Sequence, residues 1–232
     1  QHGGQAIPAF DFFMAKGVAK SFRKHLASFI NFYVAMENGT QADEKAIRTL
    51  IKEHLPSIKS TEAERETLRI ALIALQIIID KEHLTRIAEK AYQQTKKDTH
   101  QAMEGFIHNL NTMHSRGGNQ VVFSSINYGT DTSAEGRLVI EELLKATIEG
   151  LGTRGEVPVF PIQIFKVKDG VSYSEKDFEK AMKAENIEDA MRGTYEAPNF
   201  DLLLRACQTT SKALFPNFMF LDTPFNKNEK WK

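Results

Sequence analysis

The sequence has 232 residues, of which 41% are hydrophobic and 26% are charged. This composition is typical of a soluble globular chain and excludes disordered, fibrous and disulfide-rich proteins. The 30 basic residues balance the 30 acidic ones, so net charge provides no attraction to nucleic acid or to an anionic membrane. The single cysteine, Cys207, cannot form an internal disulfide, and no secretory signal is recognisable in the first residues. We therefore expect a cytoplasmic protein that binds neither nucleic acid nor membrane.

Both ends of the chain resemble cut ends. The sequence starts at Gln1 inside a glycine-rich turn and stops within the polar residues 226–232. Because an isolated domain seldom begins in the middle of a tight turn, we expect an internal piece of a longer polypeptide.

The stretch from Ile7 to about Met113 is predicted to be mainly helical. Apolar residues recur at three- and four-residue spacing from Val18 to Tyr33, which predicts a helix that ends near Asn38 and Gly39. A second helix carries Ile47, Leu50 and Ile51, and it is predicted to stop near Pro56 because proline removes a backbone donor.

Two more helices are predicted before the pattern changes. One begins within residues 60–64, where a hydroxyl cap is followed by acidic residues. The apolar run from Ile70 to Ile79 is about half the length needed to cross a bilayer, so we expect a buried helix there. A long helix follows from Lys81 to Met113, with Asp98 as the candidate point for a break. Its apolar stripe from Leu84 to Leu110 predicts an exposed contact surface and, most simply, a homodimer.

Strand patterns begin after Gly117 and Gly118. Strands are predicted at 120–128, at 157–168 and at 217–221, with prolines restricting the second to an irregular edge or a strand start. Helices are predicted at 135–151 and at about 199–214, and a turn at Asp169 and Gly170. This alternation indicates an α/β fold with parallel pairing in a sheet or barrel. We therefore divide the chain into a helical region, residues 1–113, and a strand-helix-strand region, residues 114–232.

Two glycine-bearing turns are candidate anion sites: residues 1–5 and 115–120. Adjacent glycines allow a close approach of backbone amides to a ligand, and Arg116 offers a partner for phosphate. Neither turn has the spacing of a phosphate loop or of a dinucleotide-binding motif. The alternative is a helix C-cap followed by a tight turn.

Other reactive residue types do not form recognisable motifs. His2, His108 and His114 lack the spacing of a zinc site, so we expect no metal in this chain. Cys207 is expected to pack in a helix interface, and the aromatic residues from Phe10 to Phe32 are expected to form core. No serine, histidine and acid triad can be assembled, so no catalytic residue is predicted.

Four blocks carry a family resemblance: residues 2–11, 109–133, 160–166 and 215–218. Together they resemble the catalytic subunit of the anaerobic, class III glycyl-radical ribonucleoside-triphosphate reductases, in family order over nearly the whole chain. Gly117 stands where alanine is common, and Val122 where proline often stands.

The resemblance implies a ten-stranded α/β barrel of the glycyl-radical enzyme type, preceded by a helical region for dimerisation and effector binding. It implies a glycyl radical that generates a thiyl radical, which removes the ribose 3′ hydrogen, with formate as reductant and a structural zinc. ATP or dNTP effectors and a radical-SAM iron-sulfur activating enzyme are the implied partners. The radical-bearing cysteines, the glycyl site and the zinc site lie outside the motifs present here, so the chain alone is expected to bind no cofactor and to be inactive.

The turns and the first predicted strand are our candidates for holding the ribonucleoside triphosphate, because an α/β barrel builds its substrate site where strands meet helices. These predicted substrate-binding residues are His2, Gly3, Gly4, Gln5, Ser115, Arg116, Gly117, Gly118, Ser124, Ser125 and Asn127. One alternative is a non-catalytic nucleotide-binding or dimerisation module. Another is a different glycyl-radical enzyme, such as a pyruvate formate-lyase relative, which the motifs at 109–112 and 124–127 disfavour.

Overall fold

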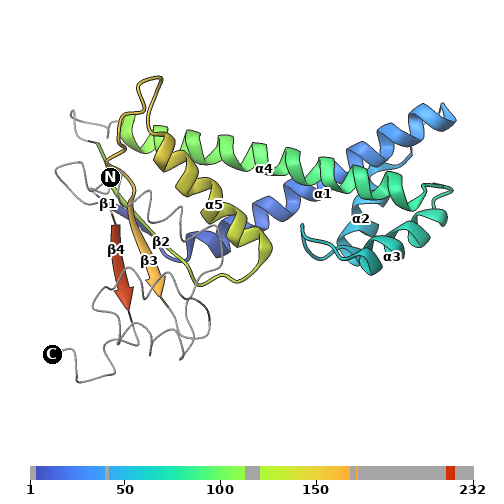
Figure 1. Cartoon of the computed structure of the whole chain (residues 1–232), viewed down its shortest axis with the longest axis horizontal. Helices are drawn as coiled ribbons and strands as arrows, with labels where there is room; N and C mark the ends of the chain where they lie inside the picture. The colour runs from blue at the N-terminus through green and yellow to red at the C-terminus, as the bar shows by residue number, and fades with distance from the viewer. Residues whose placement is uncertain (1–3, 40–41, 113–120, 168–170, 172–217, 223–232) are drawn as a thin grey trace. The chain divides into compact units, whose positions relative to one another are not determined.

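The computed structural model describes residues 4–39, 42–112, 121–167, 171 and 218–222. Within them the elements follow in the order β1 (Gly4–Ile7), α1 (Phe10–Asn38), α2 (Glu44–His54), α3 (Glu62–Ile73), α4 (Lys81–Thr112), β2 (Phe123–Tyr128), α5 (Ala134–Glu149), β3 (Ile162–Val167) and β4 (Phe218–Asp222) (Figure 1). The predicted turn at residues 169–170, the predicted helix at 199–214 and Cys207 lie outside the described residues. The chain divides into two compact units, described separately below.

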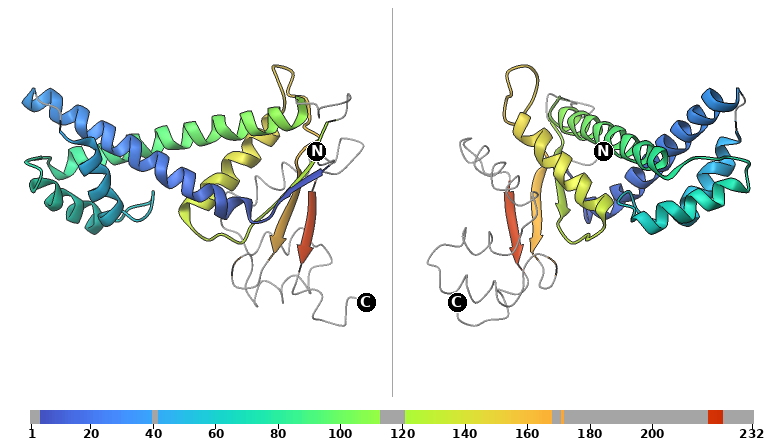
Figure 2. Two further views of the ribbon diagram at one scale, coloured as in Figure 1. Left: turned by 180° about the vertical axis from the view of Figure 1, so that it is seen from behind. Right: turned by 45° about the vertical axis from the view of Figure 1, so that its right-hand side comes forward.

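Unit 1 (residues 1–14, 100–132 and 136–232) contains a four-stranded sheet in the order β1-β2-β3-β4. All three pairings are parallel, with Gly4 beside Phe123, Ser125 beside Ile162 and Gln163 beside Phe218. Figure 2 shows β3 and β4 side by side and pointing the same way. The predicted α/β fold with parallel pairing is confirmed, as are the three predicted strands. The strand β1 was missed, because the sequence indicated only a turn there.

The two faces of this sheet differ in burial. On β2 the side chains of Ser124, Ile126 and Tyr128 are buried, whereas those of Ser125 and Asn127 are half-buried, as expected for a strand whose side chains alternate. Gln163 and Phe165 of β3 are also buried, and Ile162, Ile164 and Lys166 are half-buried. We call the face of Ser124, Ile126, Tyr128, Gln163 and Phe165 the covered face. The face of Ser125, Asn127, Ile162, Ile164 and Lys166 is called the Ser125 face.

Helix α5 packs on the covered face through a buried polar chain. The hydroxyl of Tyr128 donates to Oε1 of Gln163 at 2.8 Å, and Nε2 of Gln163 donates to Oγ1 of Thr147 at 2.9 Å. The same helix also has buried apolar residues, namely Leu138, Val139, Ile140, Leu143, Leu144 and Ala146. The helix predicted at 135–151 is therefore confirmed, with the bounds Ala134–Glu149.

The segment that leads into β3 is held by Asn111 of α4. Its Oδ1 accepts the N–H groups of Val159 and Phe160, both at 2.9 Å, and its Nδ2 donates to the carbonyl of Phe160 at 2.6 Å. Pro161 follows directly and precedes the first residue of β3. This agrees with the prediction that the prolines are confined to a strand start, where no ladder bond is lost.

Unit 2 (residues 15–99 and 133–135) is helical. Its core consists of buried residues of α1 to α4, including Val18, Phe22, Leu26, Ile30, Ile47, Ile51, Leu68, Leu72, Leu84 and Ala91. The predicted cap of the third helix is confirmed as a capping box, in which Thr61 Oγ1 accepts the N–H of Glu64 and Glu64 accepts the N–H of Thr61. His25 of α1 contacts Asp98 of α4 at 2.7 Å.

Three expectations about the helices are wrong. The run from Ile70 to Ile79 is not one buried helix, because α3 ends at Ile73 and Gln76 has a φ of +59°, which turns the chain. Ile78 is then 81% exposed while Ile77 and Ile79 are buried. Helix α4 is not broken at Asp98, whose carboxylate binds the side chains of Gln94 and His25 and so does not compete for backbone hydrogen bonds.

The stripe on α4 is also not an exposed contact surface. Leu84, Ile87, Met103 and Ile107 are all at most 9% exposed, so most of this stripe packs inside the chain. No described helix is long and apolar enough to cross a membrane.

Candidate functional site

The carboxyl ends of β1 and β2 are joined by a buried aspartate. Asp11, at the start of α1, is fully buried. Its Oδ2 accepts the backbone N–H groups of Gly129 at 2.8 Å and of Asp131 at 3.1 Å, and its Oδ1 accepts the N–H of Phe12 at 3.0 Å. A carboxylate with several N–H donors is well compensated for its burial. Asp11 therefore fixes the loop after β2 against the loop after β1.

Gly129 brings the end of β2 close to the end of β3. Its φ is +113°, and a Cβ at this position would lie 2.8 Å from the carbonyl oxygen of Lys166 and 2.9 Å from the ring of Phe165. Only glycine fits such a conformation and such an approach. The edge formed by the carboxyl ends of β2 and β3 is thus tightly fixed.

The Ser125 face presents polar side chains along this edge. Asn127 of β2 is in register with Ile164 of β3, and Lys166 lies two residues further along β3 on the same face. With about 3.3 Å per residue along a strand and about 4.8 Å between strands, Ser125, Asn127 and Lys166 span roughly 14 Å. A hydroxyl, an amide and an ammonium group follow one another there, next to the side chains of Ile162 and Ile164. Such a mixture suits a polar ligand with an anionic end.

The other predicted substrate-binding residues lie elsewhere. Ser124 is on the covered face and 4% exposed, and its Oγ has no hydrogen-bond partner within the described part of the chain. Gly4 and Gln5 are exposed at the amino end of β1, and Gly4 is in register with Phe123 at the start of β2. The remaining predicted residues, His2, Gly3, Ser115, Arg116, Gly117 and Gly118, lie outside the described residues.

No role was predicted for Asp11 or Lys166 from the sequence, although both residues lie in blocks that carry the family resemblance, 2–11 and 160–166. Residues two apart on a strand share one face, so the sequence from Ile162 to Lys166 could have placed Lys166 on the face of Ile162 and Ile164. This is the face on which we place the ligand. A group that could hold a cation was also not predicted from the sequence. It is formed by His100, Glu104 and Glu149. The i,i+4 spacing of His100 and Glu104 was a signal for that group.

Unit 2 contains a separate hollow of about 340 Å³. Arg65 donates from one terminal nitrogen to the carbonyl and to the hydroxyl of Ser60, at 2.6 and 3.1 Å. Its Nε is buried and has no hydrogen-bond partner among the described residues. The hollow is lined by Ile58, Lys59, Ser60, Arg65, Thr85, Ala88, Glu89 and Tyr92.

The comparisons with known proteins all lead to the same enzyme family. The family model described as anaerobic ribonucleoside-triphosphate reductase matches residues 1–232. The chain is 28% identical over 132 residues to the anaerobic ribonucleoside-triphosphate reductase of Escherichia coli. The matched residues make up 57% of this chain and 16% of that protein. It is 29% identical over 129 residues to the protein of that name from enterobacteria phage T4, over 56% of this chain and 18% of that protein. The protein of that name from Haemophilus influenzae is 28% identical over 127 residues, which are 55% of this chain and 15% of that protein. The matched part is therefore less than a fifth of each relative.

Proposed function

The chain belongs to the anaerobic ribonucleoside-triphosphate reductase family, and we propose that its sheet holds the ribonucleotide substrate while a protein radical reduces it. The observation that carries this proposal is the polar line of Ser125, Asn127 and Lys166 on one face of a parallel sheet. The match over the whole chain supports the reductase and not the pyruvate formate-lyase relative considered above. A non-catalytic nucleotide-binding or dimerisation module is the remaining alternative.

Each polar side chain has a role that follows from its chemistry. The ammonium group of Lys166 pairs with a phosphate, as a compact cation without geometric preference. The amide of Asn127 both donates and accepts, which suits a ribose hydroxyl, and the hydroxyl of Ser125 supplies a second such group. Asp11 and Gly129 act as positioning residues, because they fix the strand ends on which Asn127 and Lys166 stand.

The strand order supports a barrel. In β1-β2-β3-β4 each strand lies beside the next one in the sequence, which is the order of an α/β barrel. A doubly wound sheet instead reverses its direction within the sheet. We propose that these strands are four of the ten strands of a glycyl-radical enzyme barrel, in which the Ser125 face points inward.

The radical steps are assigned to residues that the motifs of this chain do not include. A glycyl radical would generate a thiyl radical, and that sulfur would remove the ribose 3′ hydrogen so that the 2′ hydroxyl leaves as water. Formate would supply the two electrons, and a radical-SAM activating enzyme would generate the glycyl radical. The only cysteine, Cys207, matches none of the radical or zinc-binding positions of the family, so we expect the chain alone to be inactive.

The hollow in unit 2 is our candidate for the effector pocket. Arg65 in its lining carries a guanidinium group, which suits a phosphate. Lys59 and Tyr92 in the lining add a cation and an aromatic ring, which suit the phosphate and the base of ATP or a dNTP.

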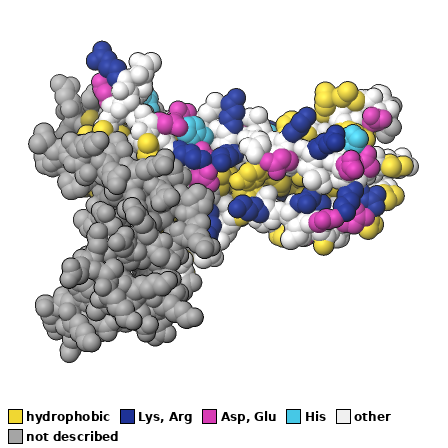
Figure 3. Space-filling view, viewed as in Figure 1, with side chains coloured by type: hydrophobic (Ala, Val, Ile, Leu, Met, Phe, Trp, Pro, Cys, Tyr) yellow, Lys and Arg dark blue, Asp and Glu magenta, His cyan; other side chains and the backbone are white. Residues whose placement is uncertain are grey.

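A homodimer contact is proposed on unit 2. Phe32, Met36 and Ile78 are 65%, 71% and 81% exposed. Figure 3 shows hydrophobic side chains among the charged ones on the face that it draws. The rings of Tyr33 and His83 lie 5.4 Å apart, which places the end of α1 beside the start of α4. Phe32 and Met36 are four residues apart and so share one face of α1, and exposed apolar side chains that lie together mark contact surfaces.

The function is tested by separating binding from turnover. The purified chain is expected to bind a ribonucleoside triphosphate but to form no deoxyribonucleotide when the activating enzyme and formate are supplied. Deoxyribonucleotide formation by the chain would show that we have misassigned the radical residues. An absence of ribonucleotide binding in a folded chain would favour the dimerisation module.

A further inference from the structure

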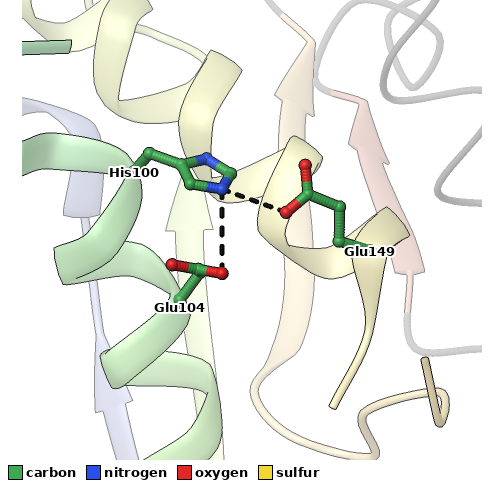
Figure 4. A group of neighbouring side chains, drawn as sticks. All are labelled: His100, Glu104 and Glu149. Carbon is green, nitrogen blue, oxygen red and sulfur yellow. Dashed lines mark hydrogen bonds and ion pairs between the residues drawn. The ribbon is translucent and has the colours of Figure 1, made fainter. Parts of the chain in front are cut away.

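A cluster of polar side chains joins α4 to α5 within unit 1. Nε2 of His100 lies 3.0 Å from Oε2 of Glu149 and 3.9 Å from Oε1 of Glu104. Figure 4 shows both carboxylates turned toward this nitrogen. Nδ1 of the same ring lies 2.9 Å from Oε2 of Glu142. From these contacts we propose that His100, Glu104 and Glu149 bind a divalent transition-metal cation, with Glu142 orienting the imidazole.

The positions of the three ligands fit one small cation. His100 and Glu104 are four residues apart on α4 and therefore share one face of the helix, and Glu149 is the last residue of α5. One ligand atom of each residue lies within 4.8 Å of the others. With metal bonds of about 2.0–2.1 Å, ligand atoms in a tetrahedral site are separated by about 3.3 Å. The distances of 3.0 and 3.9 Å bracket this value, so small rotations of the two carboxylates complete the site.

Glu142 orients the imidazole ring of His100 through Nδ1, whereas Glu104 and Glu149 face Nε2. Its side chain is 3% exposed, and Oε1 accepts a hydrogen bond from Nζ of Lys145 at 3.0 Å. In the tautomer with its proton on Nδ1, His100 donates to Oε2 of Glu142, and its Nε2 is then turned toward Glu104 and Glu149 as an acceptor.

The ligand set selects the class of cation. One imidazole and two carboxylates suit zinc, manganese, iron or cobalt, whereas magnesium and calcium prefer oxygen ligands alone. A divalent ion also offsets the repulsion between the carboxylates of Glu104 and Glu149, which converge on one nitrogen. Both carboxylates are more than half exposed, so the ion can enter from solvent and water can complete its coordination.

The site is distinct from the structural zinc that the family resemblance implies. The resemblance implies cysteine ligands for that zinc, and this chain has a single cysteine. The present site would tie the second half of α4 to the end of α5, the helix that packs on the covered face of the sheet. It would thereby stabilise unit 1 without touching the Ser125 face.

The test is a titration of the full 232-residue chain with Zn²⁺ against a chromophoric chelator, repeated with Co²⁺ to record its visible spectrum. We expect saturable binding of one equivalent. Glu104→Gln and Glu149→Gln should each weaken binding at least about 10-fold, and Glu142→Gln should weaken it by about 10- to 100-fold and alter the Co²⁺ spectrum. The matched control is His83→Gln, which removes an exposed imidazole that contacts Asp80 and should leave the affinity unchanged.

Metal-free thermal unfolding of each variant identifies any that fails to fold. Glu104→Gln and Glu149→Gln change exposed side chains and should keep the fold, so they decide the question even if Glu142→Gln unfolds. The proposal is overturned if the wild-type chain shows no saturable Zn²⁺ binding. It is equally overturned if both of these variants bind Zn²⁺ as the wild type does.

Discussion

Oδ2 of Asp11 accepts the backbone N–H of Gly129 at 2.8 Å, although 118 residues separate the two in sequence. The same oxygen also accepts the N–H of Asp131, so one buried carboxylate determines how the loops after β1 and β2 meet. The position of the proposed substrate-binding residues depends on this contact.

Replacing Asp11 by alanine should destabilise unit 1 by about 2–4 kcal/mol. The change leaves buried N–H groups without their charged acceptor, and such losses are large. Urea unfolding followed by circular dichroism measures the effect. Asp43→Ala serves as a control, since Asp43 is an exposed N-cap of α2 and its loss should cost about 1 kcal/mol. Equal costs for the two variants would show that Asp11 is only a local cap.

Gly129→Ala should cost at least about 3 kcal/mol, because the new Cβ would contact the Lys166 carbonyl and the Phe165 ring as well as strain the backbone. Gly39→Ala is the matched change, since Gly39 has a φ of +68° but no atom within 4 Å of the position that a Cβ would take. It should cost only about 1–2 kcal/mol. The difference between the two variants in thermal or urea unfolding isolates the close approach of β2 and β3. No difference would mean that this approach is not tight in solution.

The contact between His25 and Asp98 should make unit 2 sensitive to acid. Burial tends to raise the pKa of Asp98, but hydrogen bonds from Gln94 and His25 outweigh it and lower this pKa below its ordinary value. A carboxyl whose folded pKa is lowered contributes stability above its unfolded pKa, and that stability is lost as the pH falls through the folded value. Asp98→Asn should therefore flatten the loss of stability below about pH 4. A stability profile between about pH 2 and 7 that is the same in both proteins would rule out this contribution.

Exposed apolar side chains should drive self-association. Ile78→Asp places a charge on the proposed contact surface of unit 2, where Ile78 is 81% exposed, and it should shift the chain from dimer toward monomer in sedimentation equilibrium. Val159→Asp, at an exposed position of unit 1, should not. A wild-type chain that stays monomeric at high concentration would remove the basis for this contact.

Much of the fold could be predicted from local patterns. The capping box at Thr61 and Glu64, the helix α5 and three strands were all recognisable, because caps and periodicity depend on neighbouring residues. The strand β1 was missed because it has four residues and begins with glycine, which rarely forms strands. Ile70 to Ile79 was misinterpreted because its apolar residues are more numerous than one helix face can bury, and no local signal marked the turn at Gln76.

The site was harder to predict than the fold. Ser124 and Ser125 are identical neighbours, and only the register with β3 shows which of them faces α5. Asp11 owes its importance to partners more than a hundred residues away, which no local pattern reveals. The cluster around His100 likewise combines two helices, and only its i,i+4 half was visible in the sequence.

The most direct test of the account compares the two faces of β2 and β3. The affinity of the chain for a ribonucleoside triphosphate such as CTP would be measured by equilibrium dialysis for the wild type and for single variants. Lys166→Gln and Asn127→Ala should each weaken binding about 10-fold or more, because each removes a contact to the ligand. Ser125→Ala should weaken it by a smaller factor, and Ser124→Ala, on the covered face, should leave it within about 2-fold of the wild type. Unchanged binding in Lys166→Gln and Asn127→Ala, or a larger loss in Ser124→Ala than in Ser125→Ala, would contradict the assignment of the substrate to the Ser125 face.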